Sequence, residues 1–173
     1  MLLPVTGENA GSERRWLKAS LRDVLLPALH AQGFEPVALT DEEKRSELAT
    51  AYPFGRLRRA RGSDLDVVEI QLARYGKPAF RISAGTVPST GLDHEVVGHV
   101  PAEDVWSSYL PLHYEFYQVP LLRRWFSLWH WPGRQVTQAD VGDLVAEVAK
   151  DVIPEIESAL REGRLGRYAK RMG

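Results

Sequence analysis

Two histidines and a glutamate in the segment GLDHEVVGHV, residues 91–100, are residue types that can bind a metal ion and activate water. In the HExxH arrangement of helical zinc sites, histidines four residues apart share one helical face, and the glutamate acts as the base. His94 and His99 are five residues apart. On a regular helix this spacing separates the two imidazoles by about 140°, so an ordinary HExxH site is excluded.

The longer spacing resembles the HExxGH signature of the dipeptidyl-peptidase III zinc peptidases, which HEVVGH matches over residues 94–99. That resemblance implies His94 and His99 as zinc ligands, Glu95 as the base, and a helix bulge that absorbs the extra residue. The family's second glutamate motif follows the first, whereas the EEKR sequence here precedes it at residues 42–45. We therefore interpret the segment as a loop or short strand without a cofactor. A zinc-dependent hydrolase built on these three residues is the alternative.

The strands that would position functional residues are expected in the middle of the chain. Residues 54–88 alternate between apolar and polar side chains, with turn-forming residues at 62–64 and 76–78. This pattern predicts three strands in an antiparallel meander. The side chains expected on one face of the second and third strands are Val68, Ile70 and Leu72, and Phe80, Ile82 and Ala84.

A helix is predicted before these strands, over residues 12–32. Its apolar residues recur at helical spacing, Pro27 should kink it, and Gly33 is suited to a left-handed C-terminal cap. Thr40 and Glu43 then have the spacing of a capping box, which predicts a second, charged helix.

A long C-terminal helix is predicted to begin at Thr137, bend at Pro154 and end at Gly163. Strands in the middle with helices before and after indicate an α+β fold: an antiparallel sheet of about five strands packed by N- and C-terminal helices. We expect a flexible tail over residues 1–11 and a single domain over residues 12–173.

Aromatic residues are concentrated between residues 106 and 131, where nine of them lie. Residues 112–119 and 122–129 alternate and could pair as two strands. Packing of these rings in a core is one interpretation. The other is a contact surface, because Trp, Tyr and Arg are favoured at interface hot spots. The residues predicted to contact a partner are Trp106, Tyr109, Arg123, Arg124, Trp125, Trp129 and Trp131.

Four arginines lie in the first predicted strand. Alternation places Arg56 and Arg58 on one face and Arg59 and Arg61 on the other, so they cannot form one phosphate-binding patch. We expect a solvated edge strand that is protected from aggregation by its charge. The basic residues after Gly163 are expected to form a tail.

Composition narrows the classes of function. The 173-residue chain has 22 Lys and Arg against 23 Asp and Glu, a net charge of −1, so the charge balance argues against a nucleic-acid partner. It has no cysteine, which excludes disulfides and thiolate metal sites. The sequence has neither a signal-peptide pattern nor an apolar run long enough for a membrane span. We expect a cytoplasmic protein.

Residues 17–137 resemble a family of small bacterial proteins with a domain of unknown function, in which a helix ends in Gly-Phe and strands follow. The matching features here include Gly33-Phe34 and Ile70-Gln71. The resemblance implies the sheet but no activity. We predict a non-enzymatic binding module that uses the aromatic segment to contact a protein partner or a second copy of itself.

Overall fold

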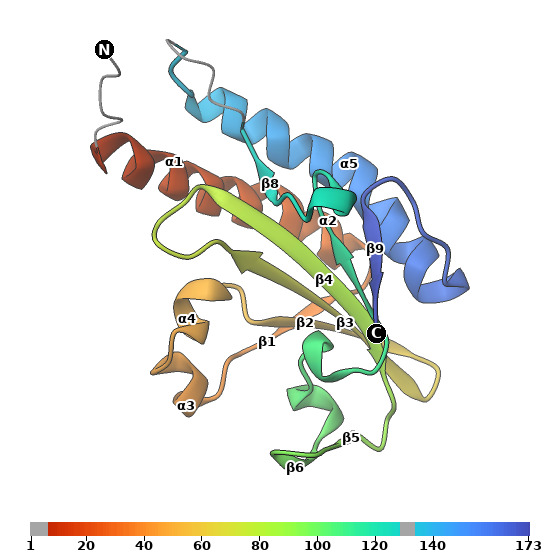
Figure 1. The fold of residues 1–173 in the computed structure, drawn as a ribbon. Coiled ribbons are helices and arrows are strands. Elements are labelled where there is room, and N and C mark those ends of the chain that lie inside the picture. The colour runs from red at the N-terminus through yellow and green to blue at the C-terminus, as the bar shows by residue number, and fades with distance from the viewer. Residues whose placement is uncertain (1–6, 129–133) are drawn as a thin grey trace.

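The central feature of the structure, a computed structural model that describes residues 7–128 and 134–173, is one large antiparallel sheet (Figure 1). Its strands are β1 (Glu35–Val37), β2 (Arg56–Arg61), β3 (Asp64–Leu72), β4 (Ala79–Val87), β7 (His113–Phe116), β8 (Phe126–Ser127) and β9 (Ala169–Met172). A separate hairpin consists of β5 (Leu92–His94) and β6 (Gly98–Val100). The helices are α1 (Gly7–Ser20), α2 (Leu26–Ala31), α3 (Asp41–Lys44), α4 (Leu48–Ala51) and α5 (Gln138–Glu162), with a π-helical turn η1 (Leu21–Leu25) and 3₁₀ turns η2 (Ala102–Asp104), η3 (Ser107–Tyr109) and η4 (Pro120–Leu122).

The sheet has the strand order β1-β2-β3-β4-β7-β9, and β8 pairs with the remaining part of β4. The predicted α+β class and the antiparallel meander are confirmed, but the described residues form seven strands in this sheet instead of about five. One added strand is β9, which pairs with β7. The basic end of the chain is therefore part of the sheet and not a free tail.

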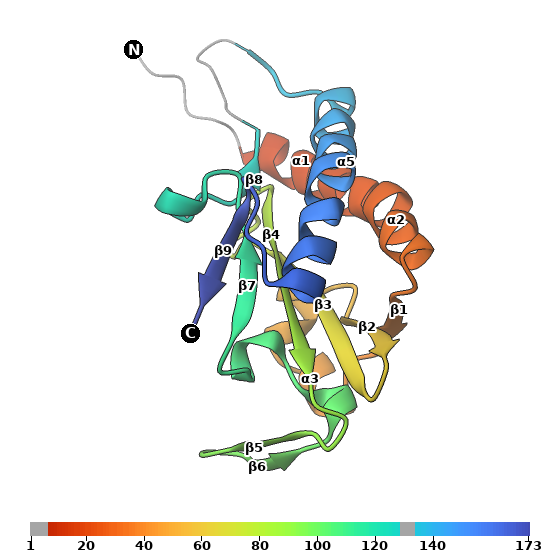
Figure 2. The ribbon, with the colours of Figure 1, turned by 90° about the vertical axis from the view of Figure 1, so that its right-hand side faces the viewer.

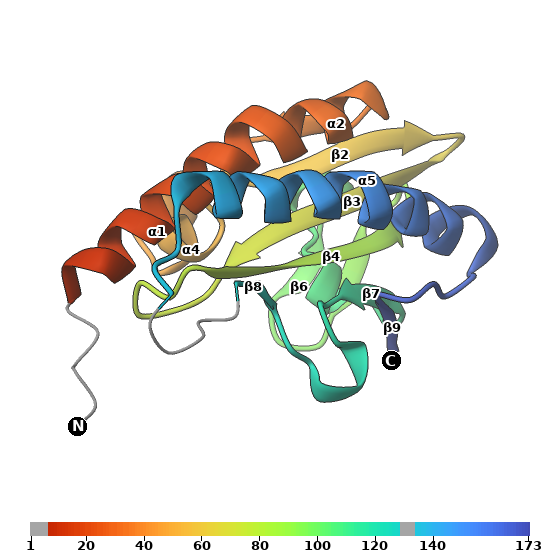
Figure 3. The same cartoon turned by 90° about the horizontal axis from the view of Figure 1, so that it is seen from above.

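One face of the sheet packs against the long helices. Figure 2 shows α1, α2 and α5 together on this side, and Figure 3 shows them lying over the sheet. We call it the helix face. Its core joins apolar side chains from strands and helices, all buried: Leu17, Leu21, Leu25, Val68, Ile70, Leu72, Phe80, Ile82, Phe116, Val145, Val152 and Ile156. These include the strand residues that alternation assigned to one face.

The helix boundaries have local causes. Gly33 follows α2 with φ 88°, the left-handed conformation predicted for it. The π-helical turn η1 ends two residues before Pro27, which has no N–H and whose ring displaces the carbonyl four residues earlier. The first helix begins at Gly7, five residues before the predicted start at residue 12. The capping box predicted at Thr40 is present.

The opposite face is covered by short elements. In Figure 1, α3, α4 and the β5–β6 hairpin lie below the sheet. A small second core on this side contains Val67 and Val87 from the strands and Ala102, Val105 and Leu110 from the η2–η3 segment. Because these covering elements are short, much of this face lies against loops that carry polar groups. We call it the polar face.

Of the predicted pairing of residues 112–119 with 122–129, the described residues show a single antiparallel bridge, Val119 with Arg124. In the structure β7 pairs with β4 at Ile82–Ala84, and β8 pairs with β4 at Ala79 and Phe80. β4 has nine residues and β7 has four, so β7 leaves the start of β4 available for pairing with β8. Within the described residues, no helix has the length and apolar content of a membrane span.

Candidate binding surface on the polar face

A row of polar side chains crosses four strands on the polar face. The strand register places Arg56 opposite Glu69, Glu69 opposite Ser83, and Ser83 opposite Glu115. These four side chains share a face because directly opposed residues in antiparallel strands point the same way. All four are buried. Buried charges require partners, so the contacts of this row define what the face can do.

Arg56 is 1% exposed and is held by groups from two segments. Its guanidinium donates to Glu43 at 2.7 Å and to Asp104 at 3.3 Å, and it lies 5.1 Å from the ring centre of Trp106. Trp106 Nε1 also donates to Glu43 at 3.0 Å, and Tyr52 packs on the Trp106 ring with centroids 4.7 Å apart. These contacts attach α3 and the η2–η3 segment to the sheet.

The predicted solvated edge strand is wrong for these arginines. β2 lies between β1 and β3, and both Arg56 and Arg58 are buried, with their terminal nitrogens donating to carboxylates and carbonyls. Alternation did divide the four arginines as expected. Arg59, on the helix face, pairs with Asp66 at 2.7 Å and with Glu157 at 2.6 Å.

Glu69 holds the η3 turn. Its carboxylate accepts from the backbone N–H of Ser107 at 2.8 Å and from the Ser107 hydroxyl at 2.7 Å. Arg58 donates to the carbonyl of Val105 on the same segment. Burial raises the pKa of Glu69 and lowers the pKa of Arg58 to about 10. Arg58 therefore stays charged at neutral pH, and the pair anchors the segment that covers the face.

At the other end of the row, Arg81 is the centre of a partly exposed group. Its Nε donates to Gln71 at 2.7 Å, and its Nη1 donates to Glu115 at 2.6 Å and to the Tyr117 hydroxyl at 2.9 Å. Trp125 covers the guanidinium, which lies 5.1 Å from the ring centre. We call these five residues the Arg81 cluster. The Arg81 side chain is 22% exposed, so this end of the row reaches solvent.

Several groups in and beside the Arg81 cluster have shifted pKa values that keep them in one protonation state at neutral pH. Burial by itself would raise the pKa of Glu115, but the nearby His113, 3.9 Å away, the hydrogen bond from Tyr117 and the charge of Arg81 outweigh it and lower the pKa to about 2. Burial raises the pKa of Tyr117, and burial with the nearby Glu69 carboxylate raises the pKa of Tyr52 to about 12. Tyr117 donates a hydrogen bond to Glu115, and all three groups are poorly matched to proton transfer at pH 7.

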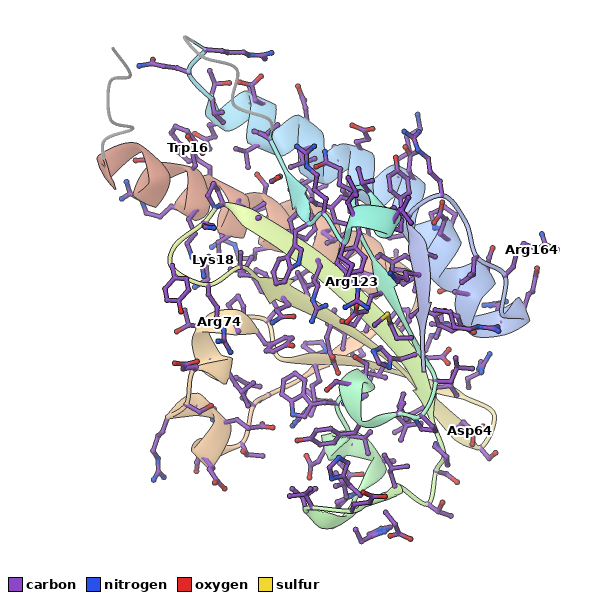
Figure 4. The ribbon with its side chains drawn as sticks, in the orientation of Figure 1. Trp16, Lys18, Asp64, Arg74, Arg123 and Arg164 are labelled. Carbon is purple, nitrogen blue, oxygen red and sulfur yellow. The ribbon has the colours of Figure 1, made fainter. Side chains whose placement is uncertain are left out.

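A tight turn leads from β7 to Trp125 and extends outward from the sheet (Figure 3). Val119 and Arg124 close it, with N–H to O distances of 3.3 and 3.0 Å. Between them, Leu121 is 87% exposed and Leu122 is 73% exposed. Arg123, exposed and labelled in Figure 4, has φ 48°, a left-handed conformation that non-glycine residues rarely adopt. We call residues 119–124 the Leu121 turn.

The structure separates the predicted partner-binding residues into different environments. Trp106 is buried and belongs to the packing around Arg56. Tyr109 and Arg124 are half-buried, Trp125 is half-buried on Arg81, and Arg123 is exposed. The predicted Trp129 and Trp131 lie outside the described residues. A partner contact therefore stays a prediction, and in the described part of the segment the large exposed apolar side chains are leucines.

The HEVVGH residues form a hairpin in place of a helix. Asp93 pairs with His99 and His94 pairs with Gly98, so alternation puts the two imidazoles on opposite faces of the ribbon. His99 Nδ1 contacts Asp93 at 2.8 Å, while the His94 ring packs against Tyr109. The predicted short strand is observed, and the two histidines that the alternative assigned to zinc do not converge. Among the described residues there is no group of three or more His, Asp or Glu side chains placed to hold a metal ion.

Sequence reasoning missed the carboxylates that pair with the arginines. A signal was present, because the turn at Gly62-Ser63 fixes the β2–β3 register and so places Glu69 beside Arg56 on the same face. Comparison of the chain with protein-family models, curated proteins and solved structures found no match. The resemblance to the small bacterial family therefore remains an expectation.

Proposed function

We propose that this protein is a non-enzymatic binding module that contacts a protein partner through the Leu121 turn and the exposed edge of the Arg81 cluster. The observation that carries the proposal is the exposure of two adjacent leucines, 87% and 73%, at the tip of a closed turn. Single exposed apolar residues are common, but a contiguous pair on a projecting turn is typical of a contact surface. Full burial of each leucine would contribute roughly 1.5–3 kcal/mol.

The backbone of the turn supports the same conclusion. Arg123 is held at positive φ, which costs of order 1–3 kcal/mol for a non-glycine residue and tends to occur at functional positions. The cost is accepted where surrounding contacts fix the conformation, and here the Val119–Arg124 pair fixes it. The conformation directs the two leucines outward while the next residue, Trp125, returns to the sheet.

The Arg81 cluster gives the turn a rigid base. Trp125 follows the turn directly and lies on the Arg81 guanidinium, which is fixed by Gln71, Glu115 and Tyr117. A surface that is already ordered loses less conformational entropy on binding, so preorganisation increases affinity.

The expected partner has an apolar groove bordered by carboxylates. The leucines supply the apolar contact, and the exposed Arg123 beside them supplies a positive charge. Arginine at an interface rim pairs well with carboxylates and raises the rate of encounter. This chemistry favours an acidic protein surface over a second copy of the chain, whose own turn would present the same charge.

Site-specific photo-cross-linking tests the proposal. A benzophenone amino acid at position 121 should give a discrete cross-linked product with another protein in cells that express the full chain. The matched control is position 165, where the native leucine is also exposed, at 46%, but lies after α5. Equal products at 121 and 165, or no product at 121, would contradict the proposal, and a product formed only between two copies would replace the partner by self-association.

A further inference from the structure

A pocket of about 670 Å³ lies between α4 and the end of β3. It shares Gln71 with the Arg81 cluster, and none of its lining residues belongs to the Leu121 turn. Its volume falls within the roughly 300–1,000 Å³ typical of small-molecule sites. One wall is the segment from Ser46 to Tyr52, which includes α4. The other wall is the end of β3 and the following loop, Gln71 to Tyr75, and Arg14 of α1 completes the lining.

The loop wall is fixed in place from α1. Arg14 Nη1 donates to the carbonyl of Ala73 at 2.7 Å and to the carbonyl of Lys77 at 3.1 Å. Tyr75, at the rim, is 93% exposed and has φ 58°, so a left-handed non-glycine residue borders the opening. The wall is therefore preorganised, and an exposed aromatic ring stands beside the pocket.

The charged groups of the lining are two arginines, Arg14 and Arg74, and one carboxylate, Glu47. Arg74 and Glu47 come from opposite walls and approach to 3.8 Å, with side chains 72% and 89% exposed. An ion pair this exposed contributes about 0–1 kcal/mol, so a ligand anion can replace the Glu47 carboxylate at little cost. Figure 4 shows Arg74 on the loop that faces α4.

The inner side of the pocket has hydrogen-bonding groups next to apolar surface. The Gln71 Oε1 atom accepts from Arg81, so its amide NH₂ group is the part that can donate to a ligand. The Tyr52 hydroxyl stays protonated at neutral pH, because its pKa is raised to about 12. Leu48 and Ala51 supply apolar side chains beside these groups. The pocket thus combines hydrogen-bond donors and an excess of positive charge with flat apolar walls.

We propose that this pocket binds a small organic acid that carries an aromatic ring and a carboxylate. The carboxylate would pair with Arg74 in place of Glu47 and accept from Gln71 or Tyr52, since arginine recognises carboxylates through paired N–H donors. The ring would pack on Leu48, Ala51 and the aromatic ring of Tyr52. The proposal does not rest on the partner contact, because the Leu121 turn contributes no residue to this lining and Gln71 is the one lining residue that also belongs to the Arg81 cluster.

Titration of the full ¹⁵N-labelled chain with three probes of one shape tests the ligand class. The probes are 1-naphthoate, neutral 1-naphthamide and cationic 1-naphthylmethylammonium. The acid should saturate and shift the amides of Leu48, Tyr52, Gln71 and Ala73, with an affinity roughly tenfold above the amide, since a charge-assisted pair is about twice as strong as a neutral hydrogen bond. The cation should bind most weakly. Equal or tighter binding of the cation, or no saturable shift with the acid, overturns the proposal.

Substitutions of residues that line the pocket test where the ligand binds. Arg74→Gln should weaken binding of 1-naphthoate several-fold, and Glu47→Gln should strengthen it, because the competing carboxylate is gone. Glu35→Gln, which also removes an exposed paired carboxylate, is the matched control and should change nothing. Ala51→Trp should block the pocket, with its melting temperature as the check on folding. The same affinity in wild type, Arg74→Gln and Glu47→Gln would overturn the assignment.

Discussion

The two faces of the sheet are built from the same strands and are stabilised in different ways. On the helix face, side chains such as Ile70, Phe80 and Phe116 pack against long helices in a continuous apolar core. On the polar face, neighbouring positions on these strands carry two buried carboxylates: Glu69 accepts a hydrogen bond from Ser107 of the covering η3 turn, and Glu115 accepts one from Arg81 of β4. The stability of the helix face therefore depends on how well its apolar side chains fill the core, whereas the stability of the polar face depends on hydrogen-bond partners for its buried charges.

This difference explains why the candidate contact surface lies on one side only. On the helix face, the apolar side chains of the strands are buried under the long helices, among the residues that the structure describes. The polar face is covered by short turns. Arg81, at one end of the polar row, is partly exposed to solvent and contacts the Trp125 ring. A face stabilised by directional hydrogen bonds can hold an exposed turn in one conformation, which an apolar patch alone would not specify.

The largest effect is expected at Glu69 and Ile70, adjacent residues that point to opposite faces. Glu69→Ala should lower the free energy of unfolding by about 3–5 kcal/mol, because Arg58 loses the nearby buried carboxylate that compensates its charge. Ile70→Ala should cost about 2–5 kcal/mol through its cavity. Urea unfolding measures both.

The double variant distinguishes the two mechanisms. Combining Glu69→Leu with Arg58→Met removes both charges and should recover most of the stability lost in either single variant. If the losses in free energy of unfolding are additive instead, the polar face is stabilised by packing, as the helix face is, and not by paired charges.

The pH dependence of stability should have opposite signs at the two carboxylates. The folded pKa of Glu115 is lowered from 4.5 to about 2, so its contribution is present above about pH 4.5 and is lost as the pH falls towards 2. The folded pKa of Glu69 is raised, so its contribution is present below its unfolded pKa of 4.5 and is lost as the pH rises through the folded pKa.

Urea unfolding from pH 2 to pH 7 measures both effects. Glu115→Gln should flatten the acid side of the stability curve, and Glu69→Gln should reduce the loss above pH 4.5. Curves for the two variants that change in the same direction would contradict the assigned environments.

A smaller effect is expected where the polar face meets the Leu121 turn. Trp125→Ala removes the ring from Arg81 and should lower the free energy of unfolding by about 1 kcal/mol, near the value of a partly exposed cation–π contact. It should also speed amide hydrogen exchange at Val119 and Arg124, which close the turn. Unchanged exchange at these two amides would mean that the Arg81 cluster does not hold the turn.

The smallest effect is expected at the β5–β6 hairpin. His94 and His99 face opposite sides of the ribbon, so His99→Ala should change stability by less than about 0.5 kcal/mol. Metal analysis of untagged protein should find no stoichiometric zinc. One zinc ion per chain, lost in His94→Ala, would instead support the hydrolase alternative.

Features that depend on neighbouring residues could be predicted from the sequence. The left-handed Gly33, the capping box at Thr40 and the alternation of β3 and β4 follow from local conformational preferences. The polar row could not be predicted in full, because Glu69 is satisfied by Ser107, 38 residues away, and Arg56 by Asp104, 48 residues away.

The candidate surface shows the same limit. The sequence indicated an interaction segment between residues 106 and 131, but it drew attention to the aromatic side chains. Whether a side chain of that segment is covered depends on tertiary packing, which buries Trp106 under Tyr52 and leaves Leu121 exposed. Alternation assigns side chains to faces, and it does not show which short turn projects from the sheet.

The most direct test of the account is the affinity of the cross-linked partner, once purified, for three forms of the full chain. We predict that Leu121→Ser combined with Leu122→Ser weakens binding at least about tenfold, as loss of one buried apolar anchor alone would do. Its melting temperature should match wild type, and Leu165→Ser should bind as wild type does. Wild-type affinity in the double serine variant would contradict the proposed function.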